Sequence, residues 1–537
     1  MDTNVLYYGD NLDILRHHIP DDSIDLIYLD PPFNSQATYN VLFREESGAV
    51  SHAQIEAFED TWHWGDATAQ AYDEVLRGPH QQVARMLKAM VDGLGHNQVT
   101  AYLSMMAIRL IELRRVLKAS GSIYLHCDPT ASHYLKLLMD GAFGPKSFVN
   151  EIVWKRGSAH SDAKQGARHY GRISDTLLFY SLSDQRTWNQ QYAEYDQAYT
   201  DRDYRRVDEE GRRYRIDNLQ GPGGAAKGNP HYEFLGVKRY WRYSKERMME
   251  LHRQGRIIQT RPGAVPQYKR YLDEMPGVAV QNVWTDVPVI NNRSREILGY
   301  PTQKPLALLE RIISTSSNAG DIVLDPFCGC GTAVHAAHKL DRQWIGIDIT
   351  HLAIGLIRRR MTDAFPGLEI EVIGEPVDLT GAQELARKDK YQFQLWALDK
   401  LGAQPVAGKK KGSDKGIDGV IPFFAGPKED YKRAIVSVKG GEHAGVAAVR
   451  DLKGVLDREK EPIGILLTLN PPTKDMITEA AASGFYESDF WTKKYPRVQI
   501  ITVLEILKGK RPEMPWGGSP FAKAPTEKEK AEQEAML

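Results

Sequence analysis

Short apolar segments alternate with longer amphipathic ones over the first 150 residues. Residues 23–29 form an apolar run that ends at Asp30, which predicts a buried strand followed by an abrupt loop. Residues 101–119 and 131–139 carry apolar positions at helical spacing, and residues 122–126 between them are typical of another strand. This alternation of strands and helices predicts a mostly parallel sheet covered by helices.

The same alternation returns after residue 300. Residues 306–316 and 331–340 predict helices. Residues 321–324 and 344–348 predict the strands that precede and follow the second of these helices. The two stretches together indicate one α/β domain whose sequence is interrupted by a segment of another kind.

The interrupting segment, residues 185–290, has a different composition. It is rich in Arg, Tyr, Gly and Gln, and residues 201–270 carry 17 Lys or Arg against 9 Asp or Glu, an excess of 8 cations. The aromatic residues interleaved with these cations are Tyr204, Tyr214, Tyr232, Tyr240, Trp241 and Tyr243. Basic and aromatic side chains together suit contact with nucleic-acid phosphates and bases. An irregular solvated domain is the alternative interpretation.

The overall composition is that of a folded, soluble protein. Of 537 residues, 42% are hydrophobic and 26% are charged, and the formal net charge is −1. Only local clusters of charge therefore bear on a nucleic-acid partner. Three cysteines cannot form a disulfide framework in so long a chain, and no run of about 18 apolar residues occurs. We expect a cytoplasmic protein without membrane contact.

A glycine-rich turn follows the strand predicted at residues 321–324. The turn spans residues 325–332 and has glycines at two alternate positions, which let the backbone approach a ligand closely. The dinucleotide-binding fingerprint needs a further glycine where Val334 stands. The next strand ends at Asp348, whose carboxylate suits a ribose diol. The pattern favours a nucleoside-bearing ligand that lacks a pyrophosphate.

A second motif, Asp30-Pro31-Pro32-Phe33, follows the first predicted strand. Two prolines fix the backbone and release its carbonyl groups from sheet pairing. A carboxylate and a carbonyl can together accept both hydrogens of an exocyclic amine. An aromatic ring beside them offers a stacking face for a base extruded from a duplex. An Asp-Pro-Pro turn alone is most often structural, so its meaning depends on the glycine-rich turn.

The two motifs, in this order and with a basic insert between them, resemble the amino-group DNA methyltransferases that use S-adenosylmethionine. The order is similar to that of the β class, which includes the modification subunits of type III restriction systems. Further matching segments are residues 8–10, 121–128, 148–154 and 300–305. The resemblance covers about residues 1–362. It implies a Rossmann-like α/β methyltransferase domain with an inserted target-recognition domain.

The resemblance also implies roles for individual residues. Asp30 would orient the target amine, Pro31 would supply a carbonyl acceptor beside Pro32, and Phe33 would stack on the flipped base. Double-stranded DNA is the implied substrate. The residues implied in S-adenosylmethionine binding are Thr302 and Lys304 at its methionine or adenine end, with Asp10, Asp325, Phe327, Gly329, Gly331, Thr332 and Asp348.

The chemistry of the target atom narrows the product. Methylation at cytosine C5 needs a thiolate nucleophile, conventionally in a Pro-Cys dipeptide. None of Cys127, Cys328 and Cys330 follows a proline. Direct transfer to adenine N6 or cytosine N4 remains, and in this family an Asp before the prolines leans toward adenine. We expect adenine-N6 methylation of DNA. The alternatives are cytosine-N4 methylation, methylation of RNA or of a small molecule, and silent DNA binding.

The C-terminal region shows a third pattern. Asp418 lies in a glycine-containing loop before a strand that ends at Lys439. An Asp and a Lys on adjoining strands can share a pocket in which the carboxylate holds Mg²⁺ and the Lys supports an attacking water. The pattern resembles the Mrr-like branch of the PD-(D/E)xK nucleases, except that Ser437 stands where an acidic residue or Gln is usual. A DNA-holding domain or a non-catalytic loop is the alternative.

The expected organisation joins these regions in one chain. A restriction-modification or defence setting is expected, with a homodimer or partner subunits. The expected boundaries are residues 1–184 and 291–365 for the methyltransferase domain, 185–290 for the target-recognition insert, 366–385 for a linker, 386–510 for an α/β restriction-endonuclease-like domain, and 511–537 for a charged tail.

Overall fold

The structure is a computed structural model in which the chain forms two compact units, residues 1–189 with 282–537 and residues 190–281. No helix in its described part is long and apolar enough to cross a membrane. The expected tail is described only as far as residue 515. The described residues are 1–32, 38–44, 50–59, 64–157, 168, 170–171, 173–290, 294, 296–298, 300, 302–406, 416–426, 430–441, 444–487 and 492–515.

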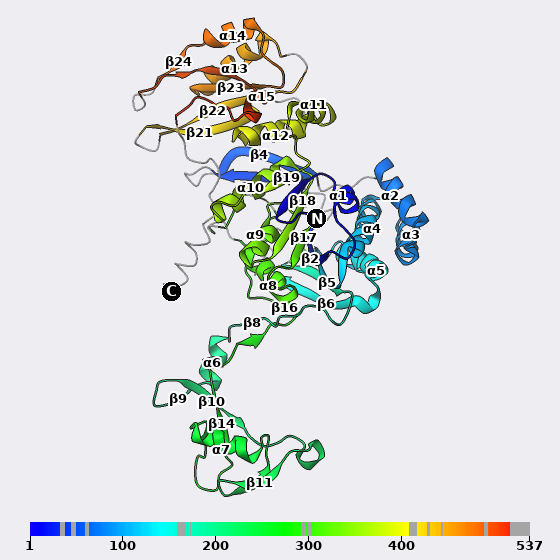
Figure 1. Cartoon of the computed structure of the whole chain (residues 1–537), viewed down its shortest axis with the longest axis vertical. Helices are drawn as coiled ribbons and strands as arrows, with labels where there is room; N and C mark the ends of the chain where they lie inside the picture. The colour runs from blue at the N-terminus through cyan, green and yellow to red at the C-terminus, as the bar shows by residue number, and fades with distance from the viewer. Residues whose placement is uncertain are drawn as a thin grey trace. The chain divides into compact units, whose positions relative to one another are not determined.

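A nine-stranded sheet forms the centre of the first unit (Figure 1). Its strand order is β16-β6-β7-β5-β2-β17-β18-β1-β19. Strand β7 is antiparallel to both of its neighbours, and the other neighbouring strands pair in parallel. The expected mostly parallel α/β sheet is thus confirmed. The strands are β1 (Val5–Tyr8), β2 (Ile24–Leu29), β5 (Leu117–Cys127), β6 (Phe148–Lys155), β7 (Ser174–Ser181), β16 (Val283–Trp284), β17 (Ile322–Asp325), β18 (Gln343–Asp348) and β19 (Glu371–Ile373).

Helices lie on both sides of this sheet (Figure 1). Leu103 and Leu110 of α4 share one apolar cluster with Ile27 of β2 and Leu125 of β5. The apolar positions that predicted these elements therefore build a common core. Helices α2 to α5 group on one side and α8 to α10 on the other. The helices are α1 (Asn11–His18), α2 (Asp66–Arg77), α3 (Gln81–Leu94), α4 (Gln98–Val116), α5 (Ser132–Phe143), α8 (Leu306–Ser316), α9 (Thr332–Lys339) and α10 (His351–Ala364).

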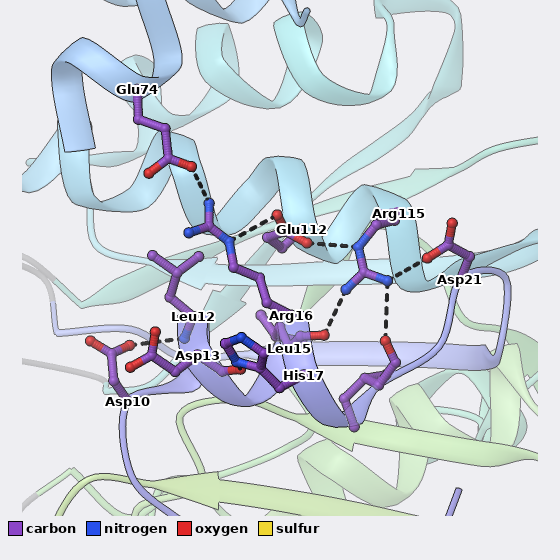
Figure 2. A network of polar contacts seen from close by, with 11 residues as sticks. Asp10, Leu12, Asp13, Leu15, Arg16, His17, Asp21, Glu74, Glu112 and Arg115 are labelled. Carbon is purple, nitrogen blue, oxygen red and sulfur yellow. Dashed lines mark hydrogen bonds and ion pairs between the residues drawn. The ribbon is translucent and has the colours of Figure 1, made fainter. Parts of the chain in front are cut away.

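Charged side chains hold α1 against α4, as Figure 2 shows. Arg16 of α1 contacts Glu74 of α2 and Glu112 of α4. Arg115 of α4 also contacts Glu112, and it donates a hydrogen bond to the Leu15 carbonyl oxygen at 2.6 Å. Because α1 begins directly after a predicted cofactor-binding residue, this network positions the helix that follows that residue.

The second unit has its own small core. Trp241 is fully buried, packs with Phe234, and donates its indole N–H to the Tyr232 carbonyl oxygen at 2.9 Å. Trp241 therefore belongs to the core of the insert and Tyr204 is also buried, although the composition of the insert suggested nucleic-acid contact for both residues. The elements are β8 (Tyr192–Ala193), α6 (Gln197–Asp203), β9 (Arg206–Val207), β10 (Arg213–Asn218), β11 (His231–Phe234), β12 (Val237–Tyr240), α7 (Lys245–Arg253), β13 (Ile257–Ile258), β14 (Gln267–Tyr271) and β15 (Val278–Ala279).

A five-stranded sheet, β20-β21-β22-β23-β26, forms the C-terminal core. Successive residues of β22 face two apolar clusters, since Val436 packs with α12 and Ile435 with α13. The segment expected as a linker, residues 366–385, contains β19 and the start of α11, whose buried Ala382 joins this core. The elements are α11 (Leu379–Lys388), α12 (Lys390–Leu401), β20 (Gln404–Pro405), β21 (Gly419–Gly426), β22 (Asp430–Lys439), α13 (Val446–Glu459), β23 (Ile463–Thr468), α14 (Lys474–Ala481), β26 (Val498–Thr502) and α15 (Val503–Leu507).

Candidate functional site

One pocket of about 590 Å³ gathers most of the site residues predicted from the sequence. Gly331 is not part of the pocket wall in the described structure, and Phe33 lies outside the described residues. The predicted residues in the wall are Asp10, Asp30, Pro31, Pro32, Thr302, Lys304, Asp325, Phe327, Gly329, Thr332 and Asp348.

The strand order explains why these residues meet. Strand β2 lies between β5 and β17, so Asp30 after β2 is adjacent to the glycine-rich turn after β17. Asp348 ends β18, and Asp10 follows β1. Ligands of open α/β sheets bind beyond the carboxyl ends of the strands. The residues of cofactor type therefore lie on the β17-β18-β1 side of β2.

The glycine-rich turn has a backbone that glycine adopts most readily. Gly329 and Gly331 have φ angles of 53° and 75°, in the left-handed region. The Gly329 N–H donates to Asp348 Oδ2 at 2.9 Å, which joins the turn to the end of β18. A Cβ atom at Gly331 would lie 2.9 Å from the Ile357 side chain. Gly331 thus permits close packing of the start of α9 against α10.

Three carboxylates shape the cofactor side of the pocket. Burial raises the pKa of Asp325 well above its ordinary value, although the Phe327 N–H donates to its Oδ1 at 3.0 Å. Burial also raises the pKa of Asp348. Asp10 Oδ1 accepts a hydrogen bond from Arg109 at 2.7 Å. Carboxylate oxygens have several acceptor sites, so these groups can also accept hydroxyl or amine hydrogens from a ligand.

Lys304 pairs with the carboxylate of the Asp-Pro-Pro motif. Its Nζ contacts Asp30 Oδ2, and the two side chains are 12% and 15% exposed. The resemblance had implied a position for Lys304 at one end of the cofactor instead. A cation held against Asp30 fixes the direction of that carboxylate, and a fixed direction is what orienting a substrate amine requires.

Further side chains line the same pocket without having been assigned to it from the sequence, and five charged or aromatic ones among them bear on the chemistry. Two signals were available, because Arg109 is a cation within the apolar run of α4 and Asp175 lies at the start of an apolar strand. The aromatic residues of this set lie in segments that the sequence analysis described without giving them a role in the site. The five residues are Tyr28, Arg109, Trp154, Arg156 and Asp175.

The predicted nuclease residues lie at the start of one strand of the C-terminal sheet and at the end of the neighbouring strand. Asp418 precedes β21, and its Oδ2 accepts hydrogen bonds from the Val438 N–H at 2.6 Å and the Ser437 hydroxyl at 3.3 Å. Lys439 ends β22. Within the described ranges, no group of three or more His, Cys, Asp or Glu could hold a metal ion. Mg²⁺ commonly takes one or two carboxylates together with water and substrate phosphate.

Comparison with known families now bears on these two sites. A family model described as DNA methylase matches residues 24–358, more than half of the chain. The chain belongs to the DNA methylase family. A second model, described as restriction endonuclease, matches residues 385–488. The recognition of the DNA amino-methyltransferase family with an Mrr-like C-terminal domain is confirmed.

Curated relatives of this DNA methylase include restriction-modification enzymes. The Type II methyltransferase M.EcaI of Enterobacter cloacae is 31% identical over 263 residues, covering 48% of this chain and 57% of the relative. The Type III restriction-modification enzyme StyLTI Mod subunit of Salmonella typhimurium is 27% identical over 357 residues, covering 63% and 50%. DNA adenine methyltransferase YhdJ of Escherichia coli is 49% identical over 80 residues, covering 15% and 27%. The chain spans about half the length of the first two relatives.

S-adenosylmethionine is the cofactor of this DNA methylase family, and the pocket residues fit it. The left-handed turn at Gly329 brings backbone to the pocket without a side chain, and Asp348 offers acceptors for ribose hydroxyls. Asp10 and Asp325 add acidic groups to the same wall. Acidic walls suit a ligand that carries an ammonium and a sulfonium group.

Proposed function

We propose that this chain transfers a methyl group from S-adenosylmethionine to the exocyclic N6 of adenine in double-stranded DNA. The observation that carries the proposal is that one pocket contains both the Asp30-Pro31-Pro32 motif and the glycine-rich turn. When bound, the cofactor supplies a methyl group activated by the sulfonium. Direct transfer needs the acceptor and cofactor residues side by side, and pairing of β2 with β17 supports this.

The acceptor side of the proposal rests on the end of β2. Asp30 would accept one hydrogen of the target amine and the Pro31 carbonyl the other, which raises electron density on the nitrogen. Pro32 keeps the backbone extended, and Lys304 holds the Asp30 carboxylate in place. The base would enter by leaving the duplex, with Phe33 as the proposed stacking partner.

The cofactor side of the proposal rests on three strand ends. Asp348 would accept ribose hydroxyls, and Gly331 acts through packing of the turn rather than by contact. Lys304 is assigned to Asp30 on the geometry of the ion pair. The residues proposed to contact S-adenosylmethionine are Asp10, Thr302, Asp325, Phe327, Gly329, Thr332 and Asp348.

The product of the reaction tests this proposal. The protein is incubated with unmodified DNA or RNA and S-adenosylmethionine, and digested nucleosides are identified by mass spectrometry. N6-methyladenine in DNA is expected. N4-methylcytosine would keep the direct-transfer mechanism and change the base, and methylated RNA alone would refute the DNA substrate.

Asp30→Ala tests the role of the acceptor motif. We expect methyl transfer to fall by about a hundredfold or more, because the amine loses its oriented acceptor, while cofactor affinity stays within about twofold. Asp128→Ala is the matched control, since Asp128 follows the neighbouring strand β5 and is not part of the pocket wall in the described structure. A loss of cofactor affinity as large as the loss of transfer would contradict the role of Asp30.

The second unit is proposed to recognise the DNA target. Its cations would bind phosphates, so DNA affinity should fall steeply with salt. Charge reversal at Lys238 and Arg239 should weaken DNA binding and leave cofactor affinity unchanged. A homodimer and partner subunits of a restriction system are proposed from the family setting. Exposed cations of this unit include Arg205, Arg206, Lys227, Lys238, Arg239, Arg242 and Arg261.

A second proposed activity is Mg²⁺-dependent DNA cleavage by the C-terminal domain. The Val438 N–H holds the Asp418 carboxylate beside the end of β22, next to Lys439 along the chain. Lys439→Ala should abolish cleavage in Mg²⁺ and preserve methylation, because it removes the cation that supports the attacking water. Cleavage that persists in this variant refutes the assignment, and DNA binding without cleavage in the wild type favours a DNA-holding domain.

A further inference from the structure

A buried row of three polar side chains runs behind the wall of the pocket. The Tyr28 hydroxyl lies 2.9 Å from His126 Nδ1, and His126 Nε2 lies 3.3 Å from Asp175 Oδ2. All three residues are buried. Tyr28 and Asp175 line the pocket, and His126 is not part of the wall in the described structure. His126 therefore connects two wall residues from behind.

The three residues come from adjacent strands on the acceptor side of the sheet. Tyr28 is in β2, His126 in β5 and Asp175 in β7, whereas the cofactor-type residues follow β17, β18 and β1 on the other side of β2. Arg156 extends the row, with its Nε 3.4 Å from Asp175 Oδ1. Tyr28 lies in β2 two residues before Asp30, which directly follows the strand, so the row ends beside the acceptor motif.

The directions of these hydrogen bonds follow from charge. Burial favours a raised pKa for Asp175, but the hydrogen bond from His126 and the charges of Arg156 and Lys304 outweigh it and hold the pKa below its ordinary value. An ionised carboxylate only accepts, so His126 donates from Nε2. In the tautomer that carries its proton on Nε2, Nδ1 is an acceptor. Burial raises the pKa of Tyr28 well above its ordinary value, so its phenol keeps its proton and donates it to Nδ1.

We propose that His126 is a positioning residue that locks Tyr28 and Asp175 into the wall that receives the target base. The inference rests on the proposed methyl transfer and adds residues outside the Asp-Pro-Pro motif to it. A wall fixed before the base arrives does not have to be ordered during the reaction. Trp154, another wall residue, meets the His126 ring edge-on with ring centroids 5.8 Å apart and braces it.

A pair of Tyr→Phe variants tests this role. Tyr124 is the register partner of Tyr28 on β5, and its buried hydroxyl is 2.7 Å from Ser316 Oγ. Tyr28→Phe and Tyr124→Phe each remove one buried hydroxyl hydrogen bond, so similar shifts in Tm are expected. Tyr28→Phe should lower the single-turnover rate about tenfold at saturating cofactor and DNA, with the Kd for S-adenosylmethionine within about twofold. Tyr124→Phe should retain the wild-type rate.

Two variants of His126 extend the test. His126→Gln retains a donor and an acceptor and should keep part of the rate, whereas His126→Leu should lose at least as much as Tyr28→Phe. Equal rate losses in Tyr28→Phe and Tyr124→Phe would overturn the proposal. A weaker Kd for S-adenosylmethionine that matches the rate loss would also overturn it, because the row would then serve the cofactor.

A spectroscopic measurement tests the row without activity. The ¹⁵N-histidine spectrum should show His126, assigned by its disappearance in His126→Gln, as the tautomer protonated on Nε2. Tyr28→Phe should move its Nδ1 resonance, and an unmoved resonance would overturn the proposal. A wild-type protein that methylates no DNA would refute the proposed function, and this spectrum would still decide whether the row exists.

Discussion

Replacement of Glu375 by Gln should loosen the junction between the methylase domain and the C-terminal domain. Glu375 is 5% exposed and lies among side chains of α10 and α12. Its Oε2 is 2.8 Å from Lys400 Nζ and 3.6 Å from Arg358 Nη1, and its Oε1 is 3.4 Å from His351 Nδ1. Gln keeps the shape of the side chain and removes the charge that these groups surround.

The magnitude of the effect follows from the pKa of Glu375. Burial alone would raise this pKa, but the hydrogen bond from His351 and the charges of Lys400 and Arg358 lower it from 4.5 to about 2. A difference of about 2.5 in pKa corresponds to about 3 kcal/mol of stabilisation at neutral pH. Removing one partner of a buried ion pair commonly costs about 3–5 kcal/mol. We therefore expect Glu375→Gln to cost about 3 kcal/mol.

The dependence on pH has a definite sign. Because the folded pKa of Glu375 lies below the unfolded one, the unfolded chain binds more protons between them. The stabilisation is complete above about pH 4.5 and is lost as the pH falls toward about 2. Burial also lowers the pKa of His351 from 6.5, so acid below that value favours the unfolded chain there too. Glu375→Gln should remove the pH dependence of the unfolding free energy that Glu375 causes, and it should leave the part that His351 causes.

Hydrogen exchange of peptides from α10 and α12 measures the opening of this junction. A loss of about 3 kcal/mol should raise their exchange rates about a hundredfold at neutral pH. Glu487→Gln is the matched control, because Glu487 pairs with Lys494 at the surface with 63% of its side chain exposed, and such pairs contribute little. Rates that rise less than about threefold, or no more than in the control, would refute the reasoning.

Two further predictions concern the pocket. Gly331→Ala should lower both the stability of the fold and the cofactor affinity, because the φ of Gly331 is 75° and the added Cβ would lie 2.9 Å from Ile357. Thermal unfolding and cofactor titration measure these two effects. An unchanged Tm would contradict the prediction. Lys304→Met should lower the methyl-transfer rate at least tenfold and leave cofactor affinity within about threefold, since Lys304 pairs with Asp30. Isothermal titration with the cofactor tests the prediction for Lys304→Met. If this variant loses mainly cofactor affinity, Lys304 binds the cofactor rather than positioning Asp30.

The elements predicted most closely from sequence are those with a strong local pattern. The helix expected at residues 306–316 is α8 to the residue, and the strand expected at 344–348 is β18 with one residue added. The helix expected to reach residue 119 ends at Val116, and β5 begins at Leu117. Pairing of Leu117 with Ile24 of β2 decides that boundary, and such a tertiary contact leaves no local signal.

The residues of the pocket could be predicted only in part from the sequence, for a similar reason. The spacing of residues in the sequence predicts motif residues such as Asp30 and Asp348, and in the structure both of these residues line the same pocket. The row of Tyr28, His126 and Asp175 has no spacing rule, because it forms only when β7 pairs antiparallel with β5. The contact of Lys304 with Asp30 likewise depends on two segments that meet only in the folded chain.

The proposed acceptor motif comes early in the chain and the proposed cofactor motif comes late. Pairing of β2 with β17 brings the two motifs together in one site. The Ile322 N–H donates to the Asp25 carboxylate at 2.9 Å across 297 residues, and the Asn11 amide donates to the Pro326 carbonyl at 2.8 Å. The insert leaves the sheet after β7 and returns through β16, at the edge of the sheet. Changes in the insert therefore need not disturb the central pairing that sets the distance between the proposed acceptor and cofactor residues, and the proposed target recognition could vary while the proposed chemistry is preserved.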